Sequence, residues 1–226
     1  MDETLLDNPA WWALNGPQAE FARGDPDAVR YADGVLTFAA LREPTAACMD
    51  QLAGQVIPGE QVYLIGDIPP LSSRWTLVQS LDCAQMLAGP AGFCRPDSQG
   101  AVLEPGDEAA LYDLVNLVQP GYFERNTHLL GRYYGIRAEG RFAAVAGERM
   151  RLPGFSELSA IVTRPGYTGR GFAKSLISEL CSWHRSQGVQ SCLHVALTNQ
   201  RAVGIYEAMG FVARRTITFQ KLARNR

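Results

Sequence analysis

The spacing of apolar residues in the first half of the chain predicts a few short elements. Residues 29–41 hold two apolar runs around Asp33-Gly34, a dipeptide typical of a turn between antiparallel strands, so we expect a hairpin there. Residues 43–56 are typical of a short helix, and residues 60–68 of a buried strand. The run 86–107 gathers Gly, Pro, Asp and Ser, and it indicates a loop or linker.

The second half has a more regular pattern, which predicts helix, three strands, helix, strand, helix and strand. Helical periodicity covers 107–118, and residues 132–152 read as two strands joined at Glu139-Gly140. A third strand over 155–165 ends at Pro165, which cannot donate to a ladder hydrogen bond.

Two further helices follow, each with recognisable end signals. The first is expected within residues 171–188 and ends before Gly188. Its apolar residues form a stripe along one face of the helix; they are Phe172, Leu176, Ile177, Leu180 and Trp183. The second covers 199–210 with Asn199 as its N-cap. Strands are expected at 191–198 and 211–222, on either side of this second helix.

Length, charge and cysteine content narrow the class of protein. The 226 residues allow one or two domains, and we expect an N-terminal α/β domain over 1–100 and a second domain over 101–226. A net charge of −2 gives no electrostatic reason for a nucleic-acid partner, and the apolar runs are too short for a membrane span.

The cysteines and the N-terminus suggest a cytoplasmic protein. The sequence has five scattered cysteines and no CxxC pair, so neither a zinc site nor a disulfide framework is predicted, and we expect reduced thiols. The acidic start MDETLLDNPAWW lacks the basic and apolar regions of a signal peptide. These cysteines are Cys48, Cys83, Cys94, Cys181 and Cys192.

The stretch RPGYTGRGFAKSL, residues 164–176, places glycines between a strand and a helix. Backbone N–H groups at a helix start lack intrahelical partners, and the helix dipole favours an anion there. Glycine also lets a phosphate approach the backbone closely. The alternative is a tight turn that binds nothing. The stretch is not a P-loop, since no Gly-Lys-Ser/Thr follows, and its glycine spacing is too short for a Rossmann fingerprint.

Two residues near this turn are candidates for chemistry. Glu157 opens the strand that leads into it, and strict alternation would place Ser159, Ile161 and Thr163 on its face, opposite Leu158, Ala160 and Val162. Tyr206 lies on the last helix, one turn from Ala202 and Gly210. Taken alone, Glu157 is either paired at an edge or poised in a cleft, and Tyr206 is an ordinary core aromatic.

Together these features resemble the GNAT superfamily of acyl-CoA-dependent N-acyltransferases. The family pattern Arg/Gln-x-x-Gly-x-Gly/Ala is matched by Gly171 and Ala173, although Thr168 replaces the usual Arg or Gln. The pattern Asn-x-x-Ala-x-x-x-Tyr-x-x-x-Gly-Phe is matched in full, by Asn199, Ala202, Tyr206, Gly210 and Phe211. Residues 121–173 also look like a bacterial branch related to the C-terminal halves of glycine N-acyltransferases.

The resemblance covers residues 107–226 and implies a fold. It implies an α/β class with a mixed, mostly antiparallel central sheet flanked by helices. It also implies that 101–226 is the acyltransferase domain and that 1–100 is a degenerate copy of the same fold.

The resemblance also implies a reaction, in which acetyl-CoA or another short acyl-CoA acylates a primary amine of a small molecule or protein. Glu157 would be the general base, with a carboxyl pKa raised toward neutrality by burial, and Tyr206 would protonate the leaving thiolate. The implied cofactor-binding residues are Ile161, Val162, Thr163, Thr168, Gly169, Arg170, Gly171, Phe172, Ala173, Lys174, Ser175, Asn199 and Tyr206.

The chemistry needs no metal. The three histidines read as isolated residues with surface or core roles, and His194, on the strand after the helix, is also a candidate substrate contact; they are His128, His184 and His194. Two other readings stay open. One is a non-catalytic acyl-CoA sensor, and the other is an interaction domain in which the glycine turn binds nothing.

Overall fold

The N-terminal half builds a small sheet with one covering helix. The computed structural model of the chain describes residues 1–89 and 100–226. Three antiparallel strands pair in the order β1–β2–β3, and α2 packs against them. The bounds are β1 (Ala22–Asp25), β2 (Ala28–Tyr31), β3 (Ala39–Leu41), α2 (Ala46–Gln55), and, before them, η1 (Glu3–Asp7), α1 (Pro9–Leu14) and η2 (Ala19–Phe21).

A second, eight-stranded sheet forms the body of the molecule, in the order β4-β11-β5-β10-β9-β8-β7-β6. Of its described pairs, β9 with β10 is parallel and the others are antiparallel, which confirms the mixed, mostly antiparallel sheet that we predicted. Its strands are β4 (Gln61–Ile65), β5 (Trp75–Ala88), β6 (Ala101–Val102), β7 (Tyr133–Ala138), β8 (Arg141–Leu152), β9 (Phe155–Thr163), β10 (Gln190–Ala196) and β11 (Phe211–Arg224).

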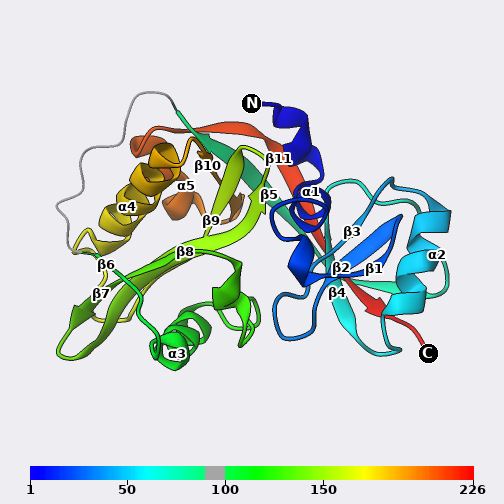
Figure 1. The fold of residues 1–226 in the computed structure, drawn as a ribbon, viewed down its shortest axis with the longest axis horizontal. Helices are drawn as coiled ribbons and strands as arrows, with labels where there is room; N and C mark the ends of the chain where they lie inside the picture. Colours follow the sequence, from blue (N-terminus) through cyan, green and yellow to red (C-terminus); the bar gives the residue numbers. More distant parts are fainter. Residues whose placement is uncertain (90–99) are drawn as a thin grey trace.

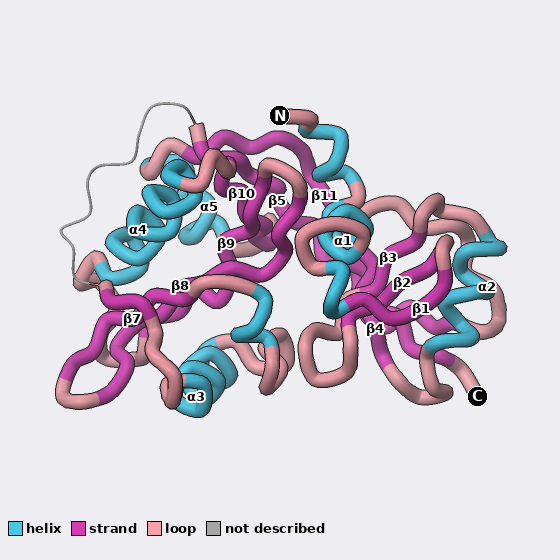
Figure 2. The backbone as a smooth tube through the Cα atoms, viewed as in Figure 1, coloured by secondary structure: helices cyan, strands magenta, loops and turns pink. Residues whose placement is uncertain are grey.

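Helices cover both faces of this sheet (Figures 1 and 2). On one face lie α4 (Phe172–Ser186) and α5 (Gln200–Ala208), and on the other lies α3 (Glu108–Val118), followed by η3 (Thr127–Leu130). The predicted stripe of α4 is confirmed at Leu176, Ile177 and Leu180, which are fully buried, and Cys181 and His184 extend it. Asn199 caps α5, as predicted, because its side chain accepts a hydrogen bond from the Ala202 N–H.

Strand β5 crosses from the N-terminal half into the body of the sheet. It pairs with β10 on one side and with β11 on the other. In Figure 1, β5 and β11 run together between the small N-terminal sheet and the body of the molecule. The predicted loop over 86–107 is therefore wrong at Met86–Ala88, which are the last residues of β5. Cys94 lies outside the described residues. The division at 100/101 stays a prediction, but the two halves share one sheet.

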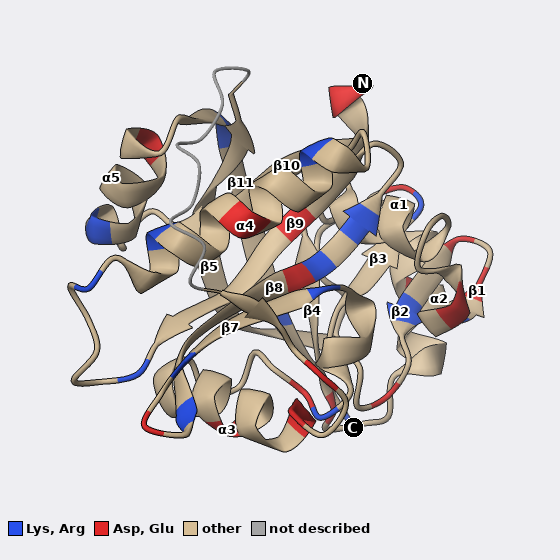
Figure 3. Cartoon of the chain, turned by 60° about the vertical axis from the view of Figure 1, so that its left-hand side comes forward, with Lys and Arg blue, Asp and Glu red and all other residues tan. Residues whose placement is uncertain are grey.

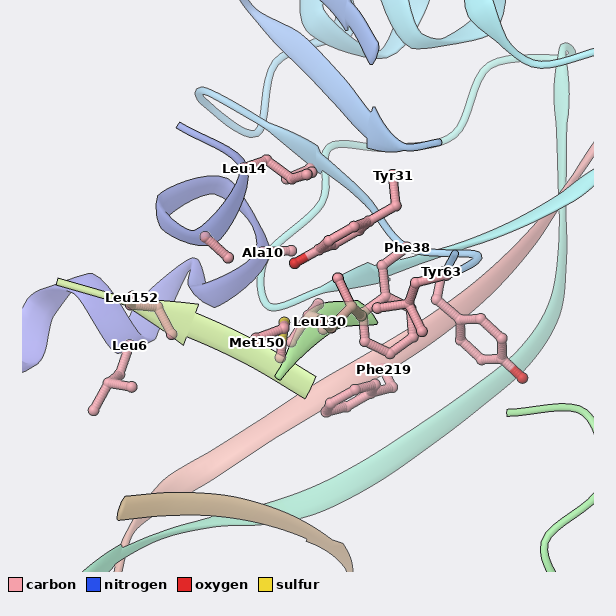
Figure 4. Packing of buried hydrophobic residues seen from close by; sticks show 14 of the residues in the cluster. Leu6, Ala10, Leu14, Tyr31, Phe38, Tyr63, Leu130, Met150, Leu152 and Phe219 are labelled. Atoms are coloured by element: carbon pink, nitrogen blue, oxygen red, sulfur yellow. The ribbon is translucent and has the colours of Figure 1, made fainter. Parts of the chain in front are cut away.

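A hydrophobic cluster joins the N-terminal half to the body. Figure 4 shows Tyr31 and Phe38 gathered with Met150 of β8 and Phe219 of β11, and all four are buried. Burying a large side chain contributes roughly 1.5–3 kcal/mol. This packing fixes the N-terminal half against the body, which matters because the candidate site takes residues from both.

Most of the other predicted elements are confirmed. Residues 32–38 connect the predicted hairpin strands β2 and β3, and Gly34 takes φ 74 in that loop. The described helices are each too short or too polar to span a bilayer. Residues 1–89 and 100–226 contain no group of three or more metal-ligating side chains. Cys48, Cys83, Cys181 and Cys192 are buried free thiols, as expected.

Candidate functional site

The two parallel strands separate and leave a pocket between them. The β9–β10 register runs from Phe155↔Gln190 to Leu158↔Leu193 and stops there. A cavity of about 290 Å³ lies where the strands part. One side of it is formed by β9, β10 and α5, through Leu158, Ser159, Ala160, Ile161, His194, Val195, Ala196, Asn199, Ala202 and Tyr206.

The rest of the pocket lining takes residues from both halves of the chain. Tyr63, Leu81 and Cys83 come from β4 and β5 of the N-terminal half, and Phe219 comes from β11. The remainder are Arg149 of β8 and, from α3 and the segment after it, Val115, Gln119, Tyr122 and Phe123. The wall is largely apolar and aromatic, as small-molecule pockets usually are.

A β-bulge changes the direction of β9 inside the pocket. Between the pairs Val145↔Val162 and Gly147↔Ser159, two residues of β9, Ala160 and Ile161, face one residue of β8. Ala160 has φ 50, in the left-handed region that non-glycine residues rarely occupy. The register thus leaves the backbone of these two β9 residues outside the described ladder, at the wall of the pocket.

The bulge also makes the predicted alternation along β9 wrong. Leu158 and Ile161 pack toward α4 and α5, whereas Ala160 and Val162 pack toward α3. Strict alternation would have placed Leu158 with Ala160. One extra residue reverses the phase of the side chains beyond it.

The glycine turn ends in an uncapped helix start, as the sequence predicted. Gly171 is the N-cap of α4, with φ 79 and no side-chain cap. The first hydrogen bond of the helix runs from the Ser175 N–H to the Gly171 carbonyl, so three earlier N–H groups lack an intrahelical partner. A Cβ built on Gly169 or Gly171 would meet no atom within 4 Å, so space for a ligand lies beside the turn.

Tyr206 lines the pocket from α5. Its ring packs edge-on against Phe211, with centroids 5.9 Å apart. Burial raises the pKa of the Tyr206 hydroxyl to about 12, so this group stays protonated at neutral pH and can donate a hydrogen bond or a proton.

Glu157 does not have the environment that we expected. Its side chain is 0% exposed and lies behind the pocket wall. Its carboxylate accepts hydrogen bonds from Arg149 Nε at 2.9 Å, from Arg149 Nη2 at 2.5 Å and from His194 Nδ1 at 2.6 Å. Figure 3 shows the basic and acidic bands of β8 and β9 next to each other.

The predicted rise in the pKa of Glu157 is therefore wrong. Burial alone would raise the pKa, but the positive charge of Arg149 and the contact with His194 outweigh burial and lower it to about 2. Three charge-assisted hydrogen bonds hold the carboxylate in its ionised form. An anion this stable is a weak proton acceptor.

His194 is part of a chain of polar contacts rather than an isolated histidine. Its Nε2 lies 3.0 Å from Nε2 of the buried Gln85. The Gln85 amide is oriented by two other contacts, because its Nε2 donates to the Leu6 carbonyl at 2.8 Å and its Oε1 accepts from Arg214 Nη1 at 2.8 Å. Gln85 thus donates to His194, which places the histidine proton on Nδ1, toward Glu157.

The two remaining histidines differ from each other. His184 is buried, with Nε2 2.9 Å from Glu148 Oε1 and Nδ1 2.7 Å from Ser191 Oγ. This network ties the end of α4 to β8 and β10. The Nδ1 atom of His128 lies 3.0 Å from the Arg125 carbonyl, within one turn. His184 and His194 were thus wrongly read as isolated, because their partners are distant in sequence.

Sequence reasoning missed several residues of the pocket. Arg149 follows Glu148 in a strand-like run, and nothing local distinguishes it from a solvent-exposed arginine. Tyr63, Cys83 and Phe219 reach the pocket only because β4, β5 and β11 pair beside β10.

Comparison with known proteins places this geometry in a family. A family model described as FR47-like protein matches residues 133–219. The crystal structure of a protein from Novosphingobium aromaticivorans, assigned to the GNAT family of acetyltransferases, is 30% identical over 98% of this chain and 99% of its own, with a TM-score of 0.91. The chain belongs to the GNAT family.

More distant GNAT structures share the fold. A GCN5-related N-acetyltransferase from Kribbella flavida is 14% identical, covers 95% of this chain and 93% of its own, and has a TM-score of 0.63. A GCN5-related N-acetyltransferase-like protein from Streptococcus suis is 15% identical over 89% of this chain and 85% of its own, with a TM-score of 0.54. No curated protein sequence matches this chain. The GNAT fold supports acyl transfer in general.

Proposed function

We propose that this protein is an N-acyltransferase that transfers an acetyl or other short acyl group from acyl-CoA to a primary amine. The observation that carries the proposal is a combination of three features: the start of α4 has no side-chain cap, the pairing of β9 with β10 stops at Leu158, and Tyr206 lines the pocket beyond that point. The GNAT fold and the fit of these residues to a CoA thioester support it.

The binding roles follow from backbone groups. Residues 168–175 would hold the pyrophosphate through the open N–H groups of α4, with help from the side chains of Arg170 or Lys174. The strand residues Ile161–Thr163 would pair with the pantetheine arm as a neighbouring strand does. The Ile161 N–H, which lies at the β-bulge, would stabilise the negative charge that develops on the thioester oxygen.

The chemical step needs a neutral amine and a protonated leaving group. The amine nitrogen forms the new bond to the acyl carbon and loses a proton to water, the C–S bond breaks, and Tyr206 would give its proton to the thiolate and regain one from water. Asn199 fixes the start of the helix that carries Tyr206. Glu157 as general base stays a prediction. Its buried, low-pKa carboxylate favours a different role, which is to hold Arg149 and His194 in the pocket wall.

A thiol-release assay with acetyl-CoA and a panel of primary amines tests the proposal. We expect release that depends on both acetyl-CoA and an amine. Binding of acetyl-CoA without turnover of any amine would support the sensor reading instead, and absence of both would leave the interaction domain.

Glu157→Gln in the same assay separates the two roles of Glu157. Removing a general base slows turnover by about 10²–10⁴-fold. A positioning residue instead changes KM for the amine and leaves the pH dependence of kcat unchanged.

A further inference from the structure

Arg149 is unusual among the residues that line the pocket, because it alone of the described ones carries a permanent charge. It lies beside the apolar and aromatic residues Leu81, Phe123 and Phe219. Its guanidinium stacks over the rings of Phe38 and Phe219, at 4.8 and 5.8 Å from their centroids. The stacking fixes the plane of the guanidinium, and Glu157 fixes its rotation in that plane through two hydrogen bonds.

The contacts with Glu157 leave part of the guanidinium unused. Nε and Nη2 donate to Glu157, but Nη1 has no hydrogen-bond partner within the part of the chain that the structure describes. The side chain is 12% exposed, and the surface it keeps belongs to the pocket wall. A guanidinium can only donate. A bound ligand that covered Nη1 without offering an acceptor would leave this donor unsatisfied, which is costly, so the position favours a ligand that brings an acceptor oxygen.

Building on the proposed N-acyltransferase function, we propose that the acceptor is a small amine bearing a carboxylate and a bulky apolar side chain, and that Arg149 binds the carboxylate through Nη1. The N-terminal half would select this acceptor, since Tyr63 and Leu81 line the pocket and Phe38 stacks on Arg149.

The rest of the pocket is consistent with a small apolar amine that bears a carboxylate, and it disfavours polyamines and peptides as acceptors. None of the described lining residues is Asp or Glu, so a second ammonium group, as in a polyamine, would be buried without a partner. The volume of about 290 Å³ lies at the lower end for ligand pockets, which suits one small molecule rather than a length of peptide. The aromatic walls favour an apolar acceptor body over glycine.

The experiment compares acceptors that differ in one group. Wild-type kcat/KM is measured with L-phenylalanine, L-phenylalaninamide, 2-phenylethylamine, glycine and spermidine. A site built to pair with a charged group rejects an analogue that lacks it. We expect L-phenylalanine to exceed its amide and 2-phenylethylamine by about 10- to 100-fold, which corresponds to one charge-assisted contact.

Arg149→Lys tests the residue itself. Lysine keeps the positive charge opposite Glu157, so the fold is retained, but it loses the planar fork that reaches both partners. We expect this variant to lose more of its rate with L-phenylalanine than with 2-phenylethylamine, so that most of the preference for the carboxylate disappears. Arg132→Lys is the matched control, because Arg132 stacks on Trp183 and does not line the pocket.

A binding measurement keeps this inference separate from the proposed function. With CoA present, N-acetyl-L-phenylalanine should bind wild type more tightly than N-acetyl-L-phenylalaninamide, and Arg149→Lys should remove the difference. Such binding without turnover of any amine would support the carboxylate site and reject the acyltransferase. Equal use of L-phenylalanine and its amide, or an equal loss for both in Arg149→Lys, would overturn the inference.

Discussion

Glu157→Gln should lower the free energy of unfolding by about 3 kcal/mol at pH 7. Its environment lowers the carboxyl pKa from 4.5 to about 2. One pKa unit corresponds to about 1.4 kcal/mol, so the folded protein favours the ionised carboxylate by about 3 kcal/mol. The buried ion pair with Arg149 leads to a free-energy loss of the same order of magnitude, because removing one partner of such a pair costs about 3–5 kcal/mol.

The effect must depend on pH in one direction. The folded pKa lies below the unfolded value, so the stabilisation is complete well above pH 4.5 and is lost as the pH falls toward 2. The gap in unfolding free energy between wild type and variant should therefore shrink, at pH 3, to less than half of its value at pH 7. Groups that titrate alike in both proteins cancel from this difference.

Urea unfolding at the two pH values measures the gap. Glu139→Gln is the control, because the Glu139 side chain is 77% exposed and its contact with Arg141 spans 3.8 Å. An exposed pair contributes less than about 1 kcal/mol. The double variant Glu157→Gln/Arg149→Met should be more stable than Glu157→Gln, since it removes the unpaired buried charge. A gap below about 1 kcal/mol at pH 7, or an equal gap at pH 3, would refute the reasoning.

Three further outcomes test the cofactor cradle, the proton donor and the polar chain. Gly171→Glu should abolish CoA binding in calorimetry, where wild type should bind in the micromolar range, about −8 kcal/mol. Gly188→Glu makes the same change at a positive-φ glycine at the other end of α4 and should keep CoA binding. Retained affinity in Gly171→Glu would reject the proposed phosphate site at the glycine turn. Tyr206→Phe should slow turnover about tenfold at unchanged CoA affinity, because water can still protonate a thiolate whose ordinary pKa is near 8.5; an unchanged rate would remove Tyr206 from the chemistry. Nitrogen-15 NMR should show the His194 proton on Nδ1 at pH 7. In Gln85→Leu, which lacks the donor to Nε2, the imidazole should no longer be restricted to this tautomer. A proton on Nε2 in wild type would contradict the contacts with Gln85.

The elements that the sequence predicted correctly are those fixed by neighbouring residues. The stripe of α4 follows from a period of 3.6 residues, and the Asn199 cap from a contact three residues away. The uncapped, glycine-containing start of α4 was predictable for the same reason. Strand β5 was missed because its pattern does not alternate. Leu77 and Val78 are exposed, whereas Gln85 is fully buried in a run of apolar residues.

The sequence by itself therefore determined the order of most elements, the glycine turn that leads into α4 and the residue types of the GNAT pattern. Tertiary structure decided what those residues do. The pKa of Glu157 is set by Arg149 and by His194, which lies 37 positions away, and Gln85 reaches that histidine from 109 positions away. The pocket wall depends on β5 pairing between β10 and β11. Electrostatic interactions and strand pairing both act between residues that are distant in sequence. The direction of the Glu157 pKa shift and the composition of the pocket wall therefore depended on partners that no local pattern identifies.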